Sequence, residues 1–285
     1  MSFLRATGVP TPISVPEPVP KLLRDLIHER TGVHFEDDRL DTMLEKLEPR
    51  ARFHECQSYL DYYYILKYEE KGPSEWRRVM DAFSVQETYF WREFDQIRAL
   101  VEQVVPAWFK SSSVPLRIWS SACATGEEPY SIAMALEEAG WGNHPIEIMA
   151  SDASEVALAK AQTRFYRERS FRILPPNLRE KYFEPRPDGF LLHSEISSRV
   201  KFQWANLVDL DAASVAGPWQ AIFCRNVFIY FSPPTIANVV RGFAGRIPPG
   251  GHLFVGASES LLKLTDQFEL KEKNGAFAYV RNQVR

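Results

Sequence analysis

The spacing of hydrophobic residues changes once along this chain, near residue 84. Between residues 19 and 83, apolar side chains recur at i, i+3, i+4 and i+7, which places them on one face of a helix. Such stripes contain Leu40, Met43, Leu44 and Leu47, and also Trp76, Val79, Met80 and Phe83. We therefore predict a small all-α domain over residues 19–83.

Four residues are typical of helix ends within this domain. Ser58 and Ser74 stand where N-caps are expected, because their hydroxyls can accept hydrogen bonds from free backbone N–H groups. Gly32 and Gly72 stand where helices are expected to end. These signals predict several short helices rather than one long helix.

From residue 84 onward, short apolar runs alternate with helical stripes. The runs are typical of buried strands and lie at residues 116–122, 146–151, 219–224 and 251–257. The first three are followed by helical stripes at 127–139, 154–164 and 233–247. This alternation indicates a mostly parallel sheet covered by helices, so the class predicted for residues 84–285 is α/β with a Rossmann-like sheet.

Two segments depart from this alternation. Strands predicted at 267–272 and 276–281 are separated by Asn274-Gly275, a strong signal for a two-residue hairpin turn. Upstream of the third strand lie short strand candidates with polar ends. We expect them to form a small antiparallel β insertion at about residues 182–203.

The N-terminal residues 1–18 show no hydrophobic period and are rich in proline. Proline fixes φ and removes a backbone donor, so a disordered tail is expected here. The tail lacks the basic start and apolar block of a signal peptide. No apolar run in the chain reaches the roughly 18–20 residues that cross a membrane, so membrane insertion is not expected.

Composition narrows the classes of function. The 285 residues carry a net charge of −3, whereas broad contact with nucleic-acid phosphates requires a basic excess. The three cysteines are far apart, without a C-x-x-C pair, and the six histidines show no metal-ligand spacing. We therefore expect no nucleic acid, no metal and no disulfide framework, and reduced thiols favour a cytoplasmic protein.

The turn after the first strand, Cys123 to Glu128, contains one glycine, two acids and no lysine. A phosphate-binding loop would contain several glycines or a lysine. An acidic turn without lysine suits a cationic adenosine-like cofactor, and S-adenosylmethionine, a sulfonium, is the candidate. Acids at a helix start are favoured by the helix dipole whatever the function, which accounts for one of the two. We expect the other, Glu128, to face the ammonium group of the cofactor.

Asp152 directly follows the second strand. An acid at this place, about 25–30 residues after the first turn, can accept hydrogen bonds from both ribose hydroxyls of a bound nucleoside. The alternative is structural, since Asp152 or Ser154 can also cap the helix predicted at 154–164. The acidic first turn favours the ribose role.

Polar residues are interleaved with aromatic ones before the first sheet strand. Gln86, Thr88 and Arg92 are spaced so that they can share one face, although aromatic runs more often belong to a core. The guanidinium of Arg92 offers fixed donors for a carboxylate, either of the cofactor or of a substrate.

Polar residues also follow two later strands. Asn206-Leu207 and Arg225-Asn226 lie at strand ends, where α/β sheets hold ligands, although Arg225 is also compatible with a simple surface charge. Tyr230 stands in an apolar run that suits a core residue. Its hydroxyl can alternatively reach a reacting group.

Several of these segments are long and unusual strings. In chain order they are ETYFWR, SSACATGEEPYS, ASD, ANL, FCRNVFIYF and GGHLFVGASESL. Together they resemble the CheR-type chemotaxis receptor methyltransferases, from about residue 20 to the C-terminus. The resemblance implies a class I methyltransferase sheet with a small β insertion, preceded by the all-α domain.

The resemblance also implies an activity, a cofactor and a site. The activity is methyl transfer from S-adenosyl-L-methionine to glutamate side chains on the cytoplasmic signalling helices of chemoreceptors, which leaves S-adenosyl-L-homocysteine. Some relatives also grip a tethering peptide at the receptor's C-terminus through the β insertion. The implied cofactor contacts are Gln86, Thr88, Arg92, Glu128, Asp152, Asn206, Leu207, Arg225 and Asn226. Arg92 and Tyr230 are implied to lie nearest the chemistry.

The sequence departs from the family pattern at two places. Gln86 stands where relatives often have asparagine, and both amides can make the same hydrogen bonds. In the all-α domain, relatives present a row of basic residues to the receptor. Here Lys46, Arg50 and Arg52 are interrupted by Glu48 and Pro49.

Two other functions are compatible with these residues. One is a methyltransferase for a small molecule or RNA, although a small-molecule enzyme would not require the all-α domain, and a basic–aromatic stripe for RNA is missing. The other is an adaptor that binds S-adenosylmethionine and docks receptors without catalysis. An adaptor could have lost Arg92, Asp152, Arg225 and Tyr230, so their presence favours an enzyme.

Overall fold

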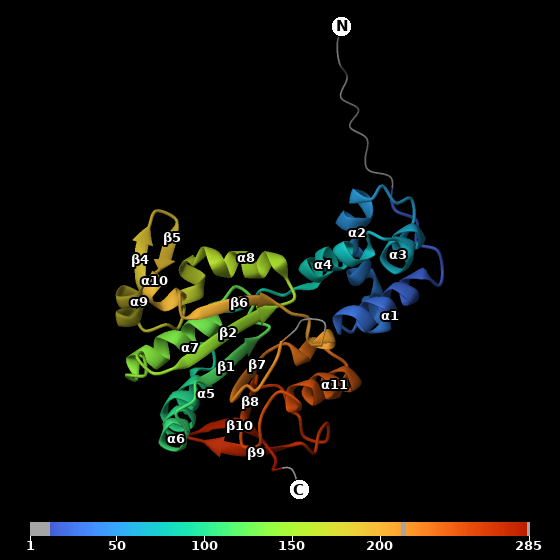
Figure 1. Cartoon of the computed structure of the whole chain (residues 1–285). Helices are drawn as coiled ribbons and strands as arrows, with labels where there is room; N and C mark the ends of the chain where they lie inside the picture. Colours follow the sequence, from blue (N-terminus) through green and yellow to red (C-terminus); the bar gives the residue numbers. More distant parts are fainter. Residues whose placement is uncertain (1–11, 212–214, 284–285) are drawn as a thin grey trace. The chain divides into compact units, whose positions relative to one another are not determined.

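The structure is a computed structural model that describes residues 12–211 and 215–283 (Figure 1). Its contacts divide the chain into two compact units. The first contains the described residues up to Arg30 together with His34–Phe83, and the second contains Thr31–Val33 and the described residues from Ser84 onward. The main division therefore falls where the hydrophobic spacing changes.

The first unit is helical. It contains α1 (Val19–Thr31) up to Arg30, the 3-10 turn η1 (Asp37–Arg39), α2 (Leu40–Phe53), α3 (Tyr59–Tyr68) and α4 (Gly72–Phe83). The apolar stripes face inward, with Leu23, Ile27, Met43, Leu47, Tyr62 and Val79 all buried. This confirms the prediction of an all-α domain before the α/β domain.

Of the four helix ends predicted in the all-α domain, two are confirmed and two are wrong. Ser58 caps α3 in a capping box with Asp61, and Gly32 follows α1 with a φ of +79°. Gly72, by contrast, begins α4 instead of ending a helix, and Ser74 lies inside the first turn of α4. A Cβ at Gly72 would lie 3.1 Å from the carbonyl oxygens of Ile65 and Leu66, so a larger residue here requires a small shift of these neighbours.

The predicted disordered tail, residues 1–18, falls largely on residues 1–11, which lie outside the described residues. In the described remainder, Ser14 hydrogen-bonds with the backbone at the start of α3. Its N–H donates to the carbonyl oxygen of Gln57 at 3.0 Å, and its carbonyl oxygen accepts from the N–H of Tyr59 at 2.9 Å.

The second unit contains a seven-stranded sheet in the order β6-β2-β1-β7-β8-β10-β9 (Figure 1). The strands are β1 (Leu116–Ser121), β2 (Ile146–Asp152), β6 (Val200–Trp204), β7 (Ala221–Cys224), β8 (His252–Val255), β9 (Phe268–Lys273) and β10 (Ala276–Arg281). Each neighbouring pair from β6 to β8 is parallel, and β10 pairs antiparallel with both β8 and β9. Asn274 and Gly275 have φ values of +50° and +80° between β9 and β10, as the hairpin signal predicts.

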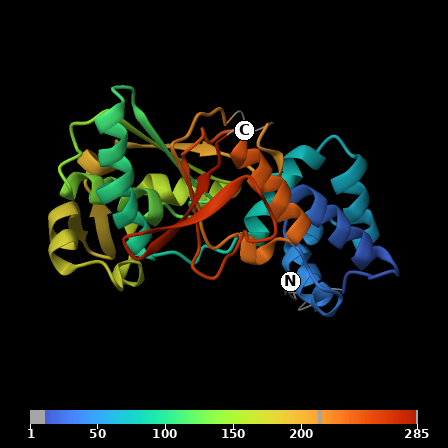
Figure 2. The same ribbon diagram turned by 90° about the horizontal axis from the view of Figure 1, so that it is seen from below.

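Helices cover both faces of this sheet. They are α5 (Phe94–Ala99), the π-helical turn η2 (Leu100–Val104), α6 (Val105–Ser111), α7 (Glu127–Glu138), α8 (Glu155–Thr163), α9 (Pro176–Tyr182), α10 (Ser194–Ser197) and α11 (Pro233–Ala244). Short 3-10 turns lie at η3 (Glu168–Phe171), η4 (Leu207–Asp209) and η5 (Phe228–Tyr230). Figure 2 shows α6 on one side of the terminal strands and α11 on the other.

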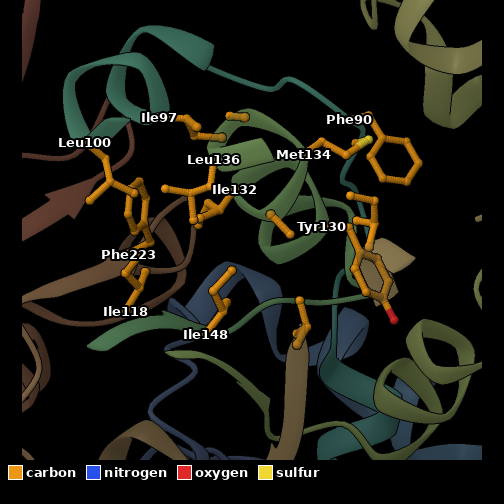
Figure 3. Packing of buried hydrophobic residues seen from close by; sticks show 14 of the residues in the cluster. Phe90, Ile97, Leu100, Ile118, Tyr130, Ile132, Met134, Leu136, Ile148 and Phe223 are labelled. Atoms are coloured by element: carbon orange, nitrogen blue, oxygen red, sulfur yellow. The ribbon is translucent and has the colours of Figure 1, made fainter. Parts of the chain in front are cut away.

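Successive strand residues alternate between two hydrophobic clusters, one for each face of the sheet. Ile118 belongs to the cluster with Leu136 of α7, and its neighbour Trp119 belongs to the cluster with Phe243 of α11. Figure 3 shows the first cluster, where Ile118, Ile148 and Phe223 of the strands face α7. The strands are thus buried on both sides, as continuous apolar runs predict.

The extent of the β insertion differs from the prediction. The antiparallel unit is a separate three-stranded sheet in the order β3-β5-β4, formed by β3 (Phe165–Tyr166), β5 (Gly189–Leu192) and β4 (Phe183–Arg186). Val200–Trp204, expected inside the insertion, is β6, which pairs in parallel with β2 in the main sheet. Its polar appearance in the sequence has a physical cause, because β6 is an edge strand and only Val200 in it is fully buried.

His252 at the start of β8 makes the second unit sensitive to acid. It is buried, and in the described part of the chain neither ring nitrogen has a hydrogen-bond partner. Burial, and next the positive charge of Lys273, lower the pKa of His252 from 6.5 to about 4. Between these pH values the folded state binds fewer protons than the unfolded state, so stability falls as pH falls.

We expect this histidine to remove about 3 kcal/mol of stability from the second unit between pH 6.5 and pH 4. His252→Leu should make the free energy of unfolding, measured by urea titration at several pH values, less dependent on pH in this window. An unchanged pH slope in the variant would exclude His252 as the cause.

The described residues contain no helix that is both long enough and apolar enough to cross a membrane. A search of the same residues finds no group of three or more histidine, cysteine or acidic side chains arranged to hold a metal ion.

Candidate cofactor site

The carboxyl ends of four parallel strands lie side by side and define the candidate site. Ser121 at the end of β1 is in register with Ser151 of β2 and with Cys224 of β7, and Cys224 is in register with Val255 of β8. The loops that follow these strands therefore start from one edge of the sheet. Ligands of α/β sheets bind at this edge.

The loop after β1 has an unusual backbone. Ala122, Ala124 and Gly126 have φ values of +56°, +47° and +92°. The left-handed region costs a residue with a Cβ roughly 1–2 kcal/mol, and such strain is common at ligand sites. A Cβ at Gly126 would lie 2.8 Å from the Cβ of Ala161, so this position requires glycine for space as well as for φ. The loop thereby brings its backbone close to α8.

Asp152 connects this loop to the end of β2. Its side chain accepts a hydrogen bond from the N–H of Ala124 and another from the N–H of Ser154, both at 2.8 Å. The cap of α8 is Ser154, whose hydroxyl accepts from the N–H of Ala157 at 3.0 Å. Asp152 is thus not the N-cap residue of α8, and its carboxylate lies at the sheet edge. Its role toward a ribose stays a prediction.

The two acids that open α7 have different surroundings. Glu127 is buried and accepts hydrogen bonds from the hydroxyls of Thr125 at 2.6 Å and Ser170 at 3.0 Å, and burial raises its pKa. Glu128 instead accepts from the hydroxyl of Ser120 and from Nε of Arg225, both at 2.6 Å. Of the two, Glu128 joins other predicted site residues. Each of its oxygens already has a protein partner, so an ammonium group would have to share them.

Arg225 is a buried charge and not a surface one, since its side chain is only 2% exposed. Besides Glu128, it donates from Nη1 to the carbonyl oxygen of Glu93 at 3.2 Å. A buried guanidinium is costly unless it is paired, and here an acid and a carbonyl oxygen satisfy it. The structure therefore joins the β1 loop, the β7 end and the segment around residue 93.

Asn226 follows with a left-handed φ of +59°. Its side-chain amide donates to Oε1 of Glu93 at 3.1 Å, and its backbone N–H donates to Oε2 of Glu259 at 2.8 Å. Glu93 and Glu259 were not predicted as site residues. Glu259 lies inside the string GGHLFVGASESL, and Glu93 directly follows the string ETYFWR, but nothing in the sequence places their carboxylates beside Asn226.

The three predicted residues before α5, Gln86, Thr88 and Arg92, have few contacts with the other predicted site residues. Arg92 is half-buried, donates from Nη1 to the carbonyl oxygen of Glu87 at 2.8 Å and lies 5.6 Å from the ring of Tyr89. Gln86 accepts from Nζ of Lys160 on α8 at 3.3 Å. In the described chain the hydroxyl of Thr88 makes no hydrogen bond. The shared polar face of the three residues thus stays a prediction.

Asn206 and Leu207 follow β6 at the same edge of the sheet. The N–H of Ala205 donates to the carbonyl oxygen of Asp152 at 3.1 Å, which holds them beside the end of β2. Both are buried, and the Asn206 side chain accepts from the N–H of Val208 at 3.2 Å, which caps η4.

Tyr230 is not a core residue. It lies in η5 with 36% of its surface exposed, and its hydroxyl has no hydrogen-bond partner in the described chain. The Tyr230 side chain is therefore partly exposed and is not held by a protein partner of its hydroxyl among the described residues.

Family models and individual relatives indicate the same protein family for this chain. Residues 86–277 match the family model for the SAM binding domain of CheR methyltransferases, and residues 21–84 match the model for their all-alpha domain. The chain is 36% identical over 263 residues to chemotaxis protein methyltransferase 2 of Vibrio cholerae, covering 90% of this chain and 91% of the relative.

Two other relatives match a similar share of the chain. The chemotaxis protein methyltransferase of Klebsiella aerogenes is 33% identical, with 87% of this chain and 85% of the relative covered. That of Escherichia coli is 31% identical, with 87% and 86% covered.

Proposed function

The chain belongs to the CheR methyltransferase family, and we propose that its catalytic site is the sheet edge where Asp152, Glu128 and Arg225 meet. The protein is an S-adenosylmethionine-dependent methyltransferase that methylates chemoreceptors on glutamate in chemotaxis. The contacts that join the predicted residues of β1, β2 and β7 are the observation that carries the assignment of the site.

The residues at this edge fit the cofactor by their chemistry. The left-handed loop after β1 permits close approach of a ligand to the backbone, and Asp152 supplies acceptors for two ribose hydroxyls. Glu128 would contact the ammonium group, while Gln86, Thr88, Asn206, Leu207 and Asn226 would complete the pocket. S-adenosylmethionine supplies an electrophilic methyl group on a sulfonium.

The methyl acceptor needs no general base from the chain. A glutamate carboxylate has a pKa of about 4.3 and is already an anion at pH 7. Water stabilises the charged reactants more than the charge-dispersed transition state, so the site should exclude water and align the reacting atoms at about 3–3.5 Å. Arg92 and Tyr230 would orient the incoming carboxylate or the methyl donor. The half-exposed Tyr230 and half-buried Arg92 suit that role.

We propose that the signalling helices of the receptor dock on the all-α domain, in the cytoplasm. Two of its basic residues already have acidic partners, because Arg50 pairs with buried Glu75 through two hydrogen bonds and Arg52 pairs with Glu48. Lys46 donates to the carbonyl oxygen of Ala82 at 3.5 Å. A receptor surface would therefore meet a partly neutralised row, with Lys46 as its least compensated charge.

A receptor tethering peptide would have a backbone to pair with on the small antiparallel sheet. Strand β4 is an edge of this sheet, but Pro185 in it has no N–H and the N–H of Phe183 donates to the carbonyl oxygen of Arg179. A peptide added along this edge would therefore bind mainly by donating its own N–H groups to carbonyl oxygens of β4. We propose this edge as the place for such a peptide.

Transfer of radiolabel tests the proposed function. Incubating the protein with methyl-labelled S-adenosylmethionine and receptor-bearing membranes should give base-labile label on the receptor, as expected for a methyl ester. Asp152→Ala should give label at background. Cofactor binding without transfer would instead support an adaptor, and base-stable label would indicate another type of acceptor.

A further inference from the structure

Two acids outside the predicted site hold the turn that carries Tyr230. We define the β7 turn as residues 225–230. Glu259, in the loop after β8, accepts hydrogen bonds at Oε2 from the N–H groups of Asn226 at 2.8 Å and Gly256 at 2.6 Å. At Oε1 it accepts from the N–H of Phe228 at 2.7 Å. One carboxylate thus connects the ends of two neighbouring parallel strands.

Glu93 holds the same turn from the other side. Its Oε1 accepts from the side-chain amide of Asn226 at 3.1 Å, and its Oε2 accepts from the N–H of Ala257 at 3.0 Å. Glu93 follows Arg92 directly in the chain. The two acids therefore connect the segment of Arg92, the β7 turn and the loop after β8.

The environment of Glu259 differs from that of an acid in an ion pair. Its side chain is largely buried, and in the described chain its hydrogen-bond donors are backbone N–H groups rather than lysine or arginine side chains. Burial raises its pKa above the ordinary value, so part of the interaction energy is lost to desolvation. A hydrophobic side chain at this position would leave three N–H groups without this acceptor, so the carboxylate is specifically required to connect the two strand ends.

Gly256 is matched to this arrangement. A Cβ on it would lie 2.6 Å from Nδ2 of Asn226 and 2.7 Å from Oε2 of Glu259. The glycine thus allows the carboxylate to approach both strand ends. Asn226 has a left-handed φ, which asparagine adopts more readily than other non-glycine residues, and the contact of its N–H with Glu259 stabilises this conformation.

From this geometry we infer that Glu259 is a positioning residue of the methyl-transfer reaction, acting through the β7 turn on Tyr230. Phe228 begins η5, the 3-10 turn that ends at Tyr230, and the N–H of Tyr230 donates to the carbonyl oxygen of Val227 at 3.1 Å. The backbone position from which the tyrosine side chain extends is therefore set by residues 226–228, which Glu259 holds. The inference rests on the proposed catalytic role of Tyr230.

A double-mutant cycle with Glu259→Gln and Tyr230→Phe tests this. Glutamine offers one oxygen to three N–H donors and turns its amide toward one of them, so the turn should shift. We expect kcat to fall by about 10- to 100-fold in Glu259→Gln. In the Tyr230→Phe background the same change should cost less than about 3-fold, because the hydroxyl it positions is already absent.

Three results separate the possibilities. If the two substitutions multiply in their effect on kcat, Glu259 does not act through Tyr230 and the inference is wrong. If Tyr230→Phe alone keeps wild-type kcat, the proposed role of Tyr230 is wrong and the inference falls with it. Normal kcat in Glu259→Gln overturns the inference alone.

A stability control uses Val104→Ala, a buried site in η2 that belongs to the other hydrophobic cluster than Phe228 of the turn. This substitution should destabilise the unit while kcat stays within about 2-fold. Gly256→Ala gives a second, independent probe if Glu259→Gln does not fold. Its new methyl group would displace Glu259 and Asn226, so the same non-additive loss with Tyr230→Phe is expected. Additive losses would again contradict the inference.

Discussion

Replacing Asp152 with alanine is expected to abolish measurable binding of S-adenosylhomocysteine in calorimetry. Hydrogen bonds from hydroxyls to a charged acceptor contribute about 1.5–3 kcal/mol each, so losing two should weaken binding by at least about 100-fold. Asp152 is 8% exposed and lies at the end of β2, beside the left-handed loop after β1.

Asp152 also accepts two backbone N–H groups, so the variant should lose some stability as well. Ser154→Ala is the matched control. It removes the cap of α8, at a cost of about 1 kcal/mol, but leaves the carboxylate in place. Binding should survive in this control. Equal loss of binding in both variants would mean that Asp152 acts through local structure alone.

Arg92→Ala should reduce kcat by about 100-fold or more while the melting temperature changes little. Loss of an oriented donor at the reacting groups is costly in the transition state, whereas the side chain makes one hydrogen bond to a carbonyl oxygen within its own segment. Arg92→Lys should recover little activity, because a lysine lacks the planar fork of donors. Single-turnover methyl transfer measures the effect directly.

The chain provides a matched control for this substitution. Arg172 also binds Glu87, donating to its Oε1 at 2.7 Å, and its guanidinium lies 3.6 Å from the same Tyr89 ring. Arg172→Ala therefore removes a similar charge and a similar ring contact. Its kcat should stay within about 3-fold of wild type. An equal loss of kcat in both variants would mean that the effect arises from the segment around Tyr89. Arg92 would then have no direct role in methyl transfer.

Much of the fold could be predicted because its signals are local. Helical spacing predicts the helices of the first unit, Ser58 predicts the start of α3, and Asn274-Gly275 predicts the terminal hairpin. Each depends on residues within a few positions of one another. Gly72 and Ser74 were misjudged because the short connection after α3, and its close approach to the carbonyl oxygens of Ile65 and Leu66, are not visible in spacing.

For the candidate site, the sequence predicts which residues lie at the strand ends but not which side chains they contact. Asp152 and Arg225 follow apolar strands directly, so the rule that ligands bind at strand ends predicts that they lie at one edge. Their actual partners are distant in sequence, since Arg225 pairs with Glu128 across 97 positions and Asn226 pairs with Glu93 across 133. No local pattern specifies such pairs.

The sequence alone therefore determined the order and type of most elements, the two-domain plan and the residues at the ends of the strands. Only the tertiary structure decided that Val200–Trp204 joins the main sheet beside β2 and that Glu93 and Glu259 hold the β7 turn. The physical reason is the range of the interactions. Helix caps and hydrophobic spacing act over one or two turns of chain, whereas strand pairing and buried carboxylate contacts are fixed only when distant segments pack together.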